Sequence, residues 1–155
     1  MANDQNAFER HRDADNRIES ATAIIEALLP LKIDEKMKRR FLSNCLWQIT
    51  QAEGRNKYDL RYRSKASLTA PPRDRRHEHV RRRKNMVDLL LRPHADVRDI
   101  VKAAQGCVVT KDEHTRLTEF DQLHPEVDGW ERYRLAKVRV IDMTTRRAVK
   151  FRELE

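Results

Sequence analysis

The sequence has little glycine, little cysteine and no long apolar run. Three glycines and five prolines in 155 residues are too few for an all-β fold built on many tight turns. The two cysteines, Cys45 and Cys107, lie in apolar segments without zinc-site spacing, so buried free thiols are expected. No segment is apolar enough to span a bilayer and the N-terminus is polar, so we predict a cytoplasmic protein without membrane contact.

Charge, in contrast, is abundant. Charged residues make up 37% of the chain, above the usual quarter, and the net charge is +8. A strongly basic chain favours polyanionic partners, because contacts to phosphates release bound counterions. Nucleic acid is therefore the expected partner, DNA more than RNA, and a protein or nucleoprotein partner is the alternative. The sequence does not indicate the oligomeric state.

The apolar pattern predicts an α+β fold that is mostly helical. Residues 1–14 are polar and are expected to form a flexible arm, and residues 15–155 to form one domain. Within this domain we expect a helical hairpin over 15–54, a basic loop over 55–84, a ββα-like finger with a helical insert over 76–120, and a short helix plus β-hairpin over 130–155.

The N-terminal hairpin is predicted from two amphipathic stretches. Asp15 or Asn16 begins the first helix and Pro30 ends it, while Asp34 caps the second. The apolar stripe of the second helix is expected to comprise Met37, Phe41, Leu42, Cys45, Leu46 and Ile49. Further along, Thr110 and Glu113 have the spacing of a capping box, so a helix is expected to begin at Lys111, after a buried strand that ends at Thr110.

Positive charge is concentrated in residues 55–84, where twelve Lys and Arg face three acidic residues. Such a local excess is typical of a phosphate-binding surface, although a solvated loop would have the same composition. Tyr58 and Tyr62 lie between the arginines and could stack on bases. The expected nucleic-acid contacts are Tyr58, Arg61, Tyr62, Arg63, Lys65, Arg76, Arg81, Arg82, Arg83 and Lys84.

Histidines and a carboxylate occur together in two segments. His77, Glu78 and His79 lie on a predicted strand, and His114 lies in the first turn of the helix that follows Thr110. Imidazole can activate water, and a carboxylate with an imidazole can hold a divalent cation, as phosphodiester hydrolysis requires. On a regular strand, however, Glu78 and His79 would point to opposite faces, and His77 and His79 would share one.

This strand, strand, helix arrangement resembles the HNH, or His-Me finger, endonucleases over about residues 76–118. The resemblance implies that Glu78 and His114 bind the metal, that His79 is the general base, and that Mg²⁺ or Mn²⁺ supports cleavage of DNA or RNA. His77 and Asn85 are possible additional members of the site. The sequence departs from the family in its long spacing and in having Asn85 as the only asparagine between the two segments.

A second interpretation is a non-catalytic phage or mobile-element factor that binds DNA, RNA or a nucleoprotein, for example as an inhibitor of a defence complex. In that case the basic segment would bind and the histidines would be structural. A basic surface for an acidic protein is a third possibility. The hydrolytic interpretation requires His79, Glu78 and His114 to converge on one open site.

Overall fold

The computed structural model describes residues 7–151, so the first six residues of the expected arm lie outside the described part. Residues 7–13 have no helix or strand, and the backbone N–H of His11 donates to the carbonyl of Glu53 at 2.8 Å. The helices are α1 (Ala14–Leu28), α2 (Glu35–Gln51), α3 (Arg83–Leu90), α4 (Val97–Lys102), α5 (Lys111–Leu123) and α6 (Gly129–Leu135). The strands are β1 (Tyr62–Ser64), β2 (Arg75–His79), β3 (Gly106–Thr110), β4 (Val140–Asp142) and β5 (Arg147–Ala148).

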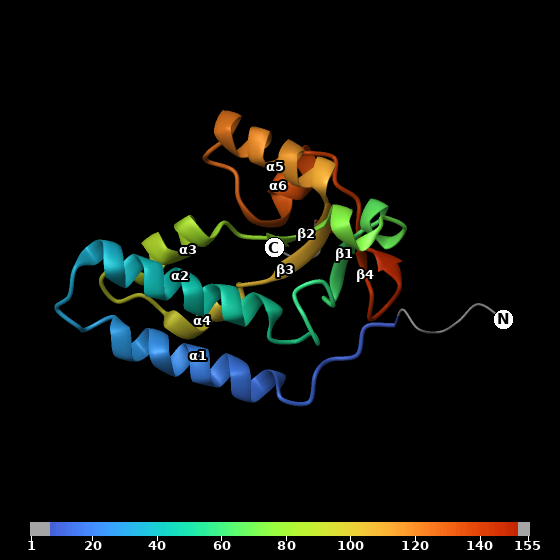
Figure 1. Cartoon of the computed structure of the whole chain (residues 1–155). Helices are drawn as coiled ribbons and strands as arrows, with labels where there is room; N and C mark the ends of the chain where they lie inside the picture. The colour runs from blue at the N-terminus through green and yellow to red at the C-terminus, as the bar shows by residue number, and fades with distance from the viewer. Residues whose placement is uncertain (1–6, 152–155) are drawn as a thin grey trace.

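The five strands form one sheet in the order β2-β3-β1-β4-β5. The pair β1–β3 is parallel and the other neighbours are antiparallel. Helices α1–α4 lie on one side of the sheet, and α5 and α6 lie on the other (Figure 1). The predicted mostly helical α+β fold is confirmed, including the hairpin and the β2–β3–α5 unit with α3 and α4 inserted between its strands.

The helical layer follows from local signals that the sequence contains. The side chain of Asp34 accepts a hydrogen bond from the backbone N–H of Met37, as expected of a helix cap. Ile25, Leu42 and Leu46 are fully buried in the core between α1 and α2. Met37 and Phe41, in contrast, are exposed, so the predicted stripe was too wide by these two residues. They lie beside the buried stripe of α2, on the side that faces away from the core.

The segment predicted as a basic loop contains the central strand of the sheet. Tyr62 and Ser64 of β1 are buried, whereas Arg61 and Arg63 alternate with them and are only partly buried. Two short 3₁₀ helices, η1 (Ala66–Leu68) and η2 (Pro72–Asp74), connect β1 to β2. The prediction missed β1 because it is only three residues long and arginines flank its buried positions.

A second core lies between the sheet and α5 with α6. Val109, Leu117 and Tyr133 are fully buried there, against Trp130. The capping box at the start of α5 is confirmed, with reciprocal hydrogen bonds between Thr110 and Glu113. Cys45 and Cys107 are free and buried, as predicted. No helix within residues 7–151 has the length and apolar character that a bilayer crossing requires.

Candidate active site

The alternation of side chains along β2 determines which of its residues can belong to one site. All five β2 residues pair regularly with β3, from Arg75 opposite Thr110 to His79 opposite Gly106. The strand therefore has no bend, and its side chains alternate between the two faces of the sheet. Glu78 contacts α5 and α6 on one face, and His77 and His79 contact α2 on the other.

Glu78 and His114 meet as the sequence predicted. The Nδ1 atom of His114 donates to Oε2 of Glu78 at 2.5 Å. The carboxylate is largely buried, whereas the imidazole side chain is 44% exposed. The hydrogen bond to Glu78 raises the pKa of His114 above its ordinary value, because the carboxylate stabilises the protonated ring. A carboxylate thus orients an imidazole that is still open to solvent.

The capping box sets the position of His114. Glu113 accepts from the backbone N–H of Thr110 at 2.9 Å, which fixes the first turn of α5 against the end of β3. Its carboxylate also accepts a hydrogen bond from Ser64, so the first turn is tied to β1 as well. His114 follows immediately and is thereby held over the β2 face that bears Glu78.

Arg132 of α6, which the sequence did not single out, completes the network. Its side chain is fully buried, and Nη2 donates to Oε1 of Glu78 at 2.8 Å. Its Nη1 atom donates to the carbonyls of His79 and Val80 at 3.0 and 3.2 Å. Its Nε atom lies 3.0 Å from Oδ1 of Asp121, although the two are not aligned for a hydrogen bond. Glu131 and Tyr133 flank Arg132 in the sequence, and this local pattern does not indicate that the arginine is buried.

His79 does not join this site. Its Nε2 atom lies 3.3 Å from Oγ1 of Thr50, on the opposite face of the sheet, and the residue is only 7% exposed. His77 lies beside it, with Nε2 at 3.1 Å from the same hydroxyl and Nδ1 at 2.9 Å from the carbonyl of Lys57. Trp47 covers both rings, with centroids 4.6 and 5.3 Å away. The expected convergence of His79 with Glu78 and His114 is therefore not found.

Gly106 makes room for the histidine pair. A Cβ atom at this position would lie 2.9 Å from the carbonyl oxygen of Thr50 and 3.0 Å from Cε1 of His77. Any larger residue would push α2 away from the sheet, because the nearest atom of Thr50 belongs to the backbone. Gly106 thus permits the close approach of α2 to β2 and β3.

The burial of His79 predicts a pH dependence of stability. Burial, together with the charges of His77, Arg83 and Arg132, lowers the pKa of His79 to about 3. Below about pH 6.5 the unfolded chain therefore binds a proton at this residue that the folded chain does not. Between pH 7 and pH 5 this should reduce the free energy of unfolding by about 2 kcal/mol, at about 1.4 kcal/mol per pH unit below 6.5.

Urea unfolding of wild type and of His79→Gln at pH 7 and pH 5 measures this contribution. The variant should lose less stability than wild type on acidification. His124→Gln, at an exposed position, is the control and should behave as wild type. Equal losses in wild type and His79→Gln would contradict the burial of a neutral imidazole at position 79.

The predicted nucleic-acid contacts divide into two groups. Arg61 is paired with Asp142 at 2.8 Å, and Arg63 with Asp59 at 2.9 Å. Lys65 and Lys84 are exposed, whereas Arg76, Arg81 and Arg83 are partly buried. Nη1 of Arg76 donates to the carbonyls of Arg73 and Arg75, and the Arg83 guanidinium lies over the ring of Trp47.

Two further predicted members, Arg82 and Tyr62, are held by contacts within the protein, and a third, Tyr58, is partly buried. Arg82 contacts Asp128 and donates to the carbonyl of Val127 at 3.1 Å. Tyr62 is buried against Trp130, with ring centroids 4.9 Å apart, and cannot stack on a base without unfolding β1. Tyr58 is half-buried.

Asn85 does not approach the Glu78–His114 pair. Its side-chain amide donates to Asp128 at 2.8 Å, in the first turn of α3. Asp128 also accepts from the backbone N–H groups of Arg82 and Gly129, both at 2.9 Å. Asn85 therefore ties the start of α3 to the start of α6.

The Glu78–His114 pair does not fit a hard-cation site as it stands. Both oxygens of Glu78 already accept hydrogen bonds, one from His114 and one from the Arg132 guanidinium. A divalent cation would have to displace a donor and sit beside a buried positive charge. Within residues 7–151, no cluster of three or more His, Cys, Asp or Glu side chains is arranged to bind a metal ion.

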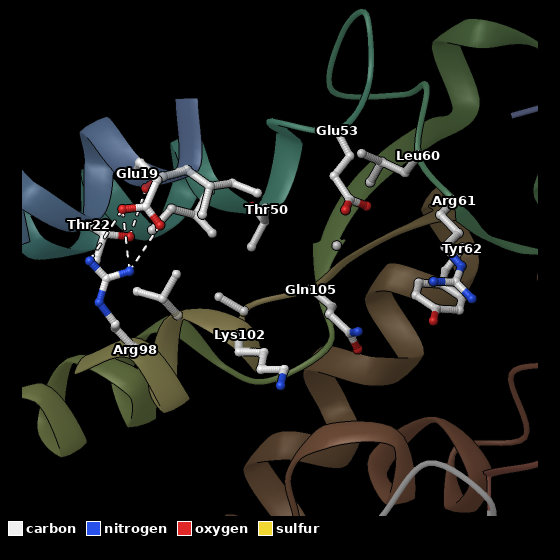
Figure 2. Close-up of a pocket in the computed structure, with 15 residues that line it drawn as sticks. Glu19, Thr22, Thr50, Glu53, Leu60, Arg61, Tyr62, Arg98, Lys102 and Gln105 are labelled. Carbon is white, nitrogen blue, oxygen red and sulfur yellow. Dashed lines mark hydrogen bonds and ion pairs between the residues drawn. The ribbon is translucent and has the colours of Figure 1, made fainter. Parts of the chain in front are cut away.

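A separate cavity of about 330 Å³ lies between α1, α4, the end of α2 and the start of β1 (Figure 2). Two of its lining residues, Arg98 and Glu19, pair with each other at 3.0 Å, and a third, Glu53, pairs at 3.1 Å with Arg10 outside the lining. Glu78 and His114 do not line it. The cavity therefore gives the paired imidazole and carboxylate no enclosed substrate pocket.

Comparisons with protein-family models, with curated proteins and with solved structures found no match for this chain. The functional interpretation therefore depends on the geometry of the site.

Proposed function

We propose that this protein binds nucleic acid and cleaves phosphodiester bonds, with His114 as the acid–base group. The observation that carries the proposal is the 2.5 Å hydrogen bond between Glu78 and the half-exposed imidazole of His114. A buried carboxylate on Nδ1 keeps the proton on that nitrogen, so Nε2 is the atom that exchanges a proton with a substrate. The pairing also restricts ring rotation, as acid–base catalysis requires.

Positive charge near His114 supports a phosphate-bearing substrate. Arg76 lies on the same face of β2 as Glu78, and its charge acts on the pKa of His114. Lys111 is exposed one helical turn before His114 on α5. A cation on β2 and a cation on α5, together with an open imidazole, could hold a phosphate and stabilise the charge that develops on it. The exposed residue Lys65 follows Ser64, which bonds to Glu113 at the start of α5, and would extend this surface along a nucleic-acid backbone.

Because both oxygens of Glu78 are occupied, we propose a metal-independent reaction with RNA as the substrate, in place of the expected preference for DNA. RNA carries its own nucleophile, the 2′-hydroxyl, next to the scissile phosphate, whereas DNA must be attacked by water. In the proposed step, Nε2 of His114 accepts the 2′-hydroxyl proton as the 2′-oxygen bonds to phosphorus. The bond from phosphorus to the 5′-oxygen breaks and that oxygen takes up a proton from solvent water, which leaves a 2′,3′-cyclic phosphate and a 5′-hydroxyl.

The test compares single-stranded RNA and DNA of one sequence, each incubated with the full chain in EDTA, in Mg²⁺ and in Mn²⁺. We expect cleavage of RNA in all three conditions, a cyclic phosphate product, and intact DNA. Cleavage that EDTA abolishes would overturn the metal-independent step and favour the Mg²⁺ or Mn²⁺ site implied by the resemblance to HNH enzymes. Absence of any cleavage would overturn the catalytic proposal.

A non-catalytic nucleic-acid-binding protein is the second candidate. It is favoured by the contacts of Glu78. Both oxygens of this carboxylate accept hydrogen bonds, one of them from a buried arginine, and such an arrangement is also typical of a structural ion pair. This candidate predicts binding that weakens steeply with salt, without product formation. The two buried thiols are compatible with the cytoplasmic location that we propose for either function.

A further inference from the structure

The outer face of the α1–α2 hairpin exposes large apolar side chains. Ile24 is 52% exposed, Met37 is 52% exposed and Phe41 is 47% exposed. The inner face of the same hairpin is fully covered by its own core, to which these three residues do not belong. An exposed apolar cluster of this kind is characteristic of an interaction surface.

Further uncharged residues lie beside these three on the same face. We define the outer strip as the exposed uncharged residues that recur every three or four positions on this face. They are Asn16, Ser20, Ala23, Ile24 and Ala27 on α1, and Met37, Phe41, Asn44 and Gln48 on α2. A hollow of about 570 Å³ runs between the two helices within it. It is lined by Ser20, Ile24, Phe41, Asn44 and Gln48, and also by Arg17 and Arg55.

We propose that a second copy of this chain covers the outer strip, so that two hairpins form a four-helix bundle. The α1 half of the strip has small residues at Ser20, Ala23 and Ala27, whereas the α2 half has the large residues Met37 and Phe41. A two-fold axis parallel to the helices lays α2 of each copy on α1 of its partner. Large side chains of one copy then pack against small side chains of the other, and Phe41 of each copy lies opposite Ser20 and Ala23 of its partner.

The charged residues at the two edges of the strip favour the same arrangement. Glu19 and Glu26 border its α1 edge, where both also contact Arg98, and their side chains remain 60% and 47% exposed. Lys36 and Arg40 are exposed on α2, at the opposite edge. The two-fold axis parallel to the helices brings the acidic edge of one copy to the basic edge of the other. A two-fold axis perpendicular to the helices would instead place α1 on α1 and bring like charges together, which is unfavourable.

The available area is sufficient for a dimer of modest affinity. Helices of about 25 Å length, placed 8–10 Å apart, offer a face of roughly 500 Å² per copy, or about 1,000 Å² in total. This lies at the lower limit for specific association, so dissociation in the micromolar range is expected. The dimer is independent of the proposed catalytic site, because the strip lies on α1 and α2 and the site on β2, α5 and α6.

Sedimentation equilibrium of the full chain from 1 to 200 µM tests the proposal. Wild type should shift with concentration from the monomer mass of 18.4 kDa towards twice that value. Phe41→Glu should weaken association at least 30-fold while the circular dichroism spectrum stays unchanged, because the residue is exposed in the monomer. Leu123→Glu, at an exposed apolar residue on α5, is the matched control and should associate as wild type.

A charge exchange tests the arrangement itself. Glu26→Lys and Arg40→Glu should each weaken association about 3–10-fold, and the double variant should recover it. A wild type that stays monomeric at 200 µM, or a Phe41→Glu variant that dimerises normally, would overturn the interface. Dimerisation without recovery in the double variant would overturn the proposed pairing of α1 with α2.

Discussion

Arg132→Met should be less stable than wild type by about 3–5 kcal/mol, the typical cost of removing one partner from a buried ion pair. The guanidinium is fully buried, and it lies next to the carboxylates of both Glu78 and Asp121. It also donates to the carbonyls of His79 and Val80, where β2 ends. Methionine would fill similar space but would leave two carboxylates without their buried cation and two carbonyls without a donor.

Urea unfolding followed by far-UV circular dichroism measures the effect, with the midpoint and the slope both recorded. Arg116→Met, at an exposed position on α5, is the matched control and should change stability by less than about 0.5 kcal/mol. The double variant Glu78→Gln, Arg132→Met should be more stable than the sum of the two single losses predicts, because the residues share one contact. A loss below about 1 kcal/mol for Arg132→Met would show that the network does not stabilise the fold.

The parts of the fold that the sequence predicted have strong local causes. Thr110 and Glu113 satisfy the first backbone N–H groups of α5 by themselves, so the helix start is encoded within four residues. Asp34 and Asp96 cap α2 and α4 in the same way. Strand alternation also predicted correctly that Glu78 and His79 would face opposite sides, since β2 pairs regularly over its whole length.

The parts that the sequence did not predict depend on contacts between distant segments. β1 is a strand because Tyr62 and Ser64 fit between β3 and β4, and three residues carry too little pattern to reveal this. Arg63 was expected on the surface, yet its side chain is mostly buried and paired with Asp59. Arg132 is buried because Glu78 and Asp121 approach it from two other elements. No local signal distinguishes such arginines from phosphate-binding ones.

The candidate site was therefore predicted in part. Glu78 and His114 were expected to meet, and they do, but the buried arginine on Glu78 argues for an oriented imidazole rather than a metal ligand pair. His79 was expected to act beside them, and its contacts with Trp47 and Thr50 give it a structural environment instead. The family resemblance and the structure therefore indicate different imidazoles. The resemblance implies His79 as the reacting group, whereas the structure leaves the imidazole of His114 open to solvent beside Glu78.

His114→Gln should lower the rate of RNA cleavage by about 10²–10⁴-fold, the usual contribution of an acid–base group. Binding of RNA should change little, because the cations Arg76 and Lys111 remain. His79→Gln is the matched control: it should retain cleavage, since its ring lies on the other face of the sheet and is nearly inaccessible. Full activity in His114→Gln together with loss in His79→Gln would assign the chemistry to the buried histidine and overturn the proposed role of His114.

The pH dependence of cleavage distinguishes positioning by Glu78 from mere stabilisation of the fold. Glu78 raises the pKa of His114, so the neutral imidazole that accepts a proton forms only at higher pH than in an isolated histidine. The rising limb of the rate profile should therefore lie above pH 6.5 in wild type and move to lower pH in Glu78→Gln, with a lower maximum because the ring is less well oriented. A Glu78→Gln variant that is folded by circular dichroism and has an unshifted profile would show that the carboxylate does not act through His114. A shifted limb would show that this one hydrogen bond sets both the orientation and the protonation of the reacting group.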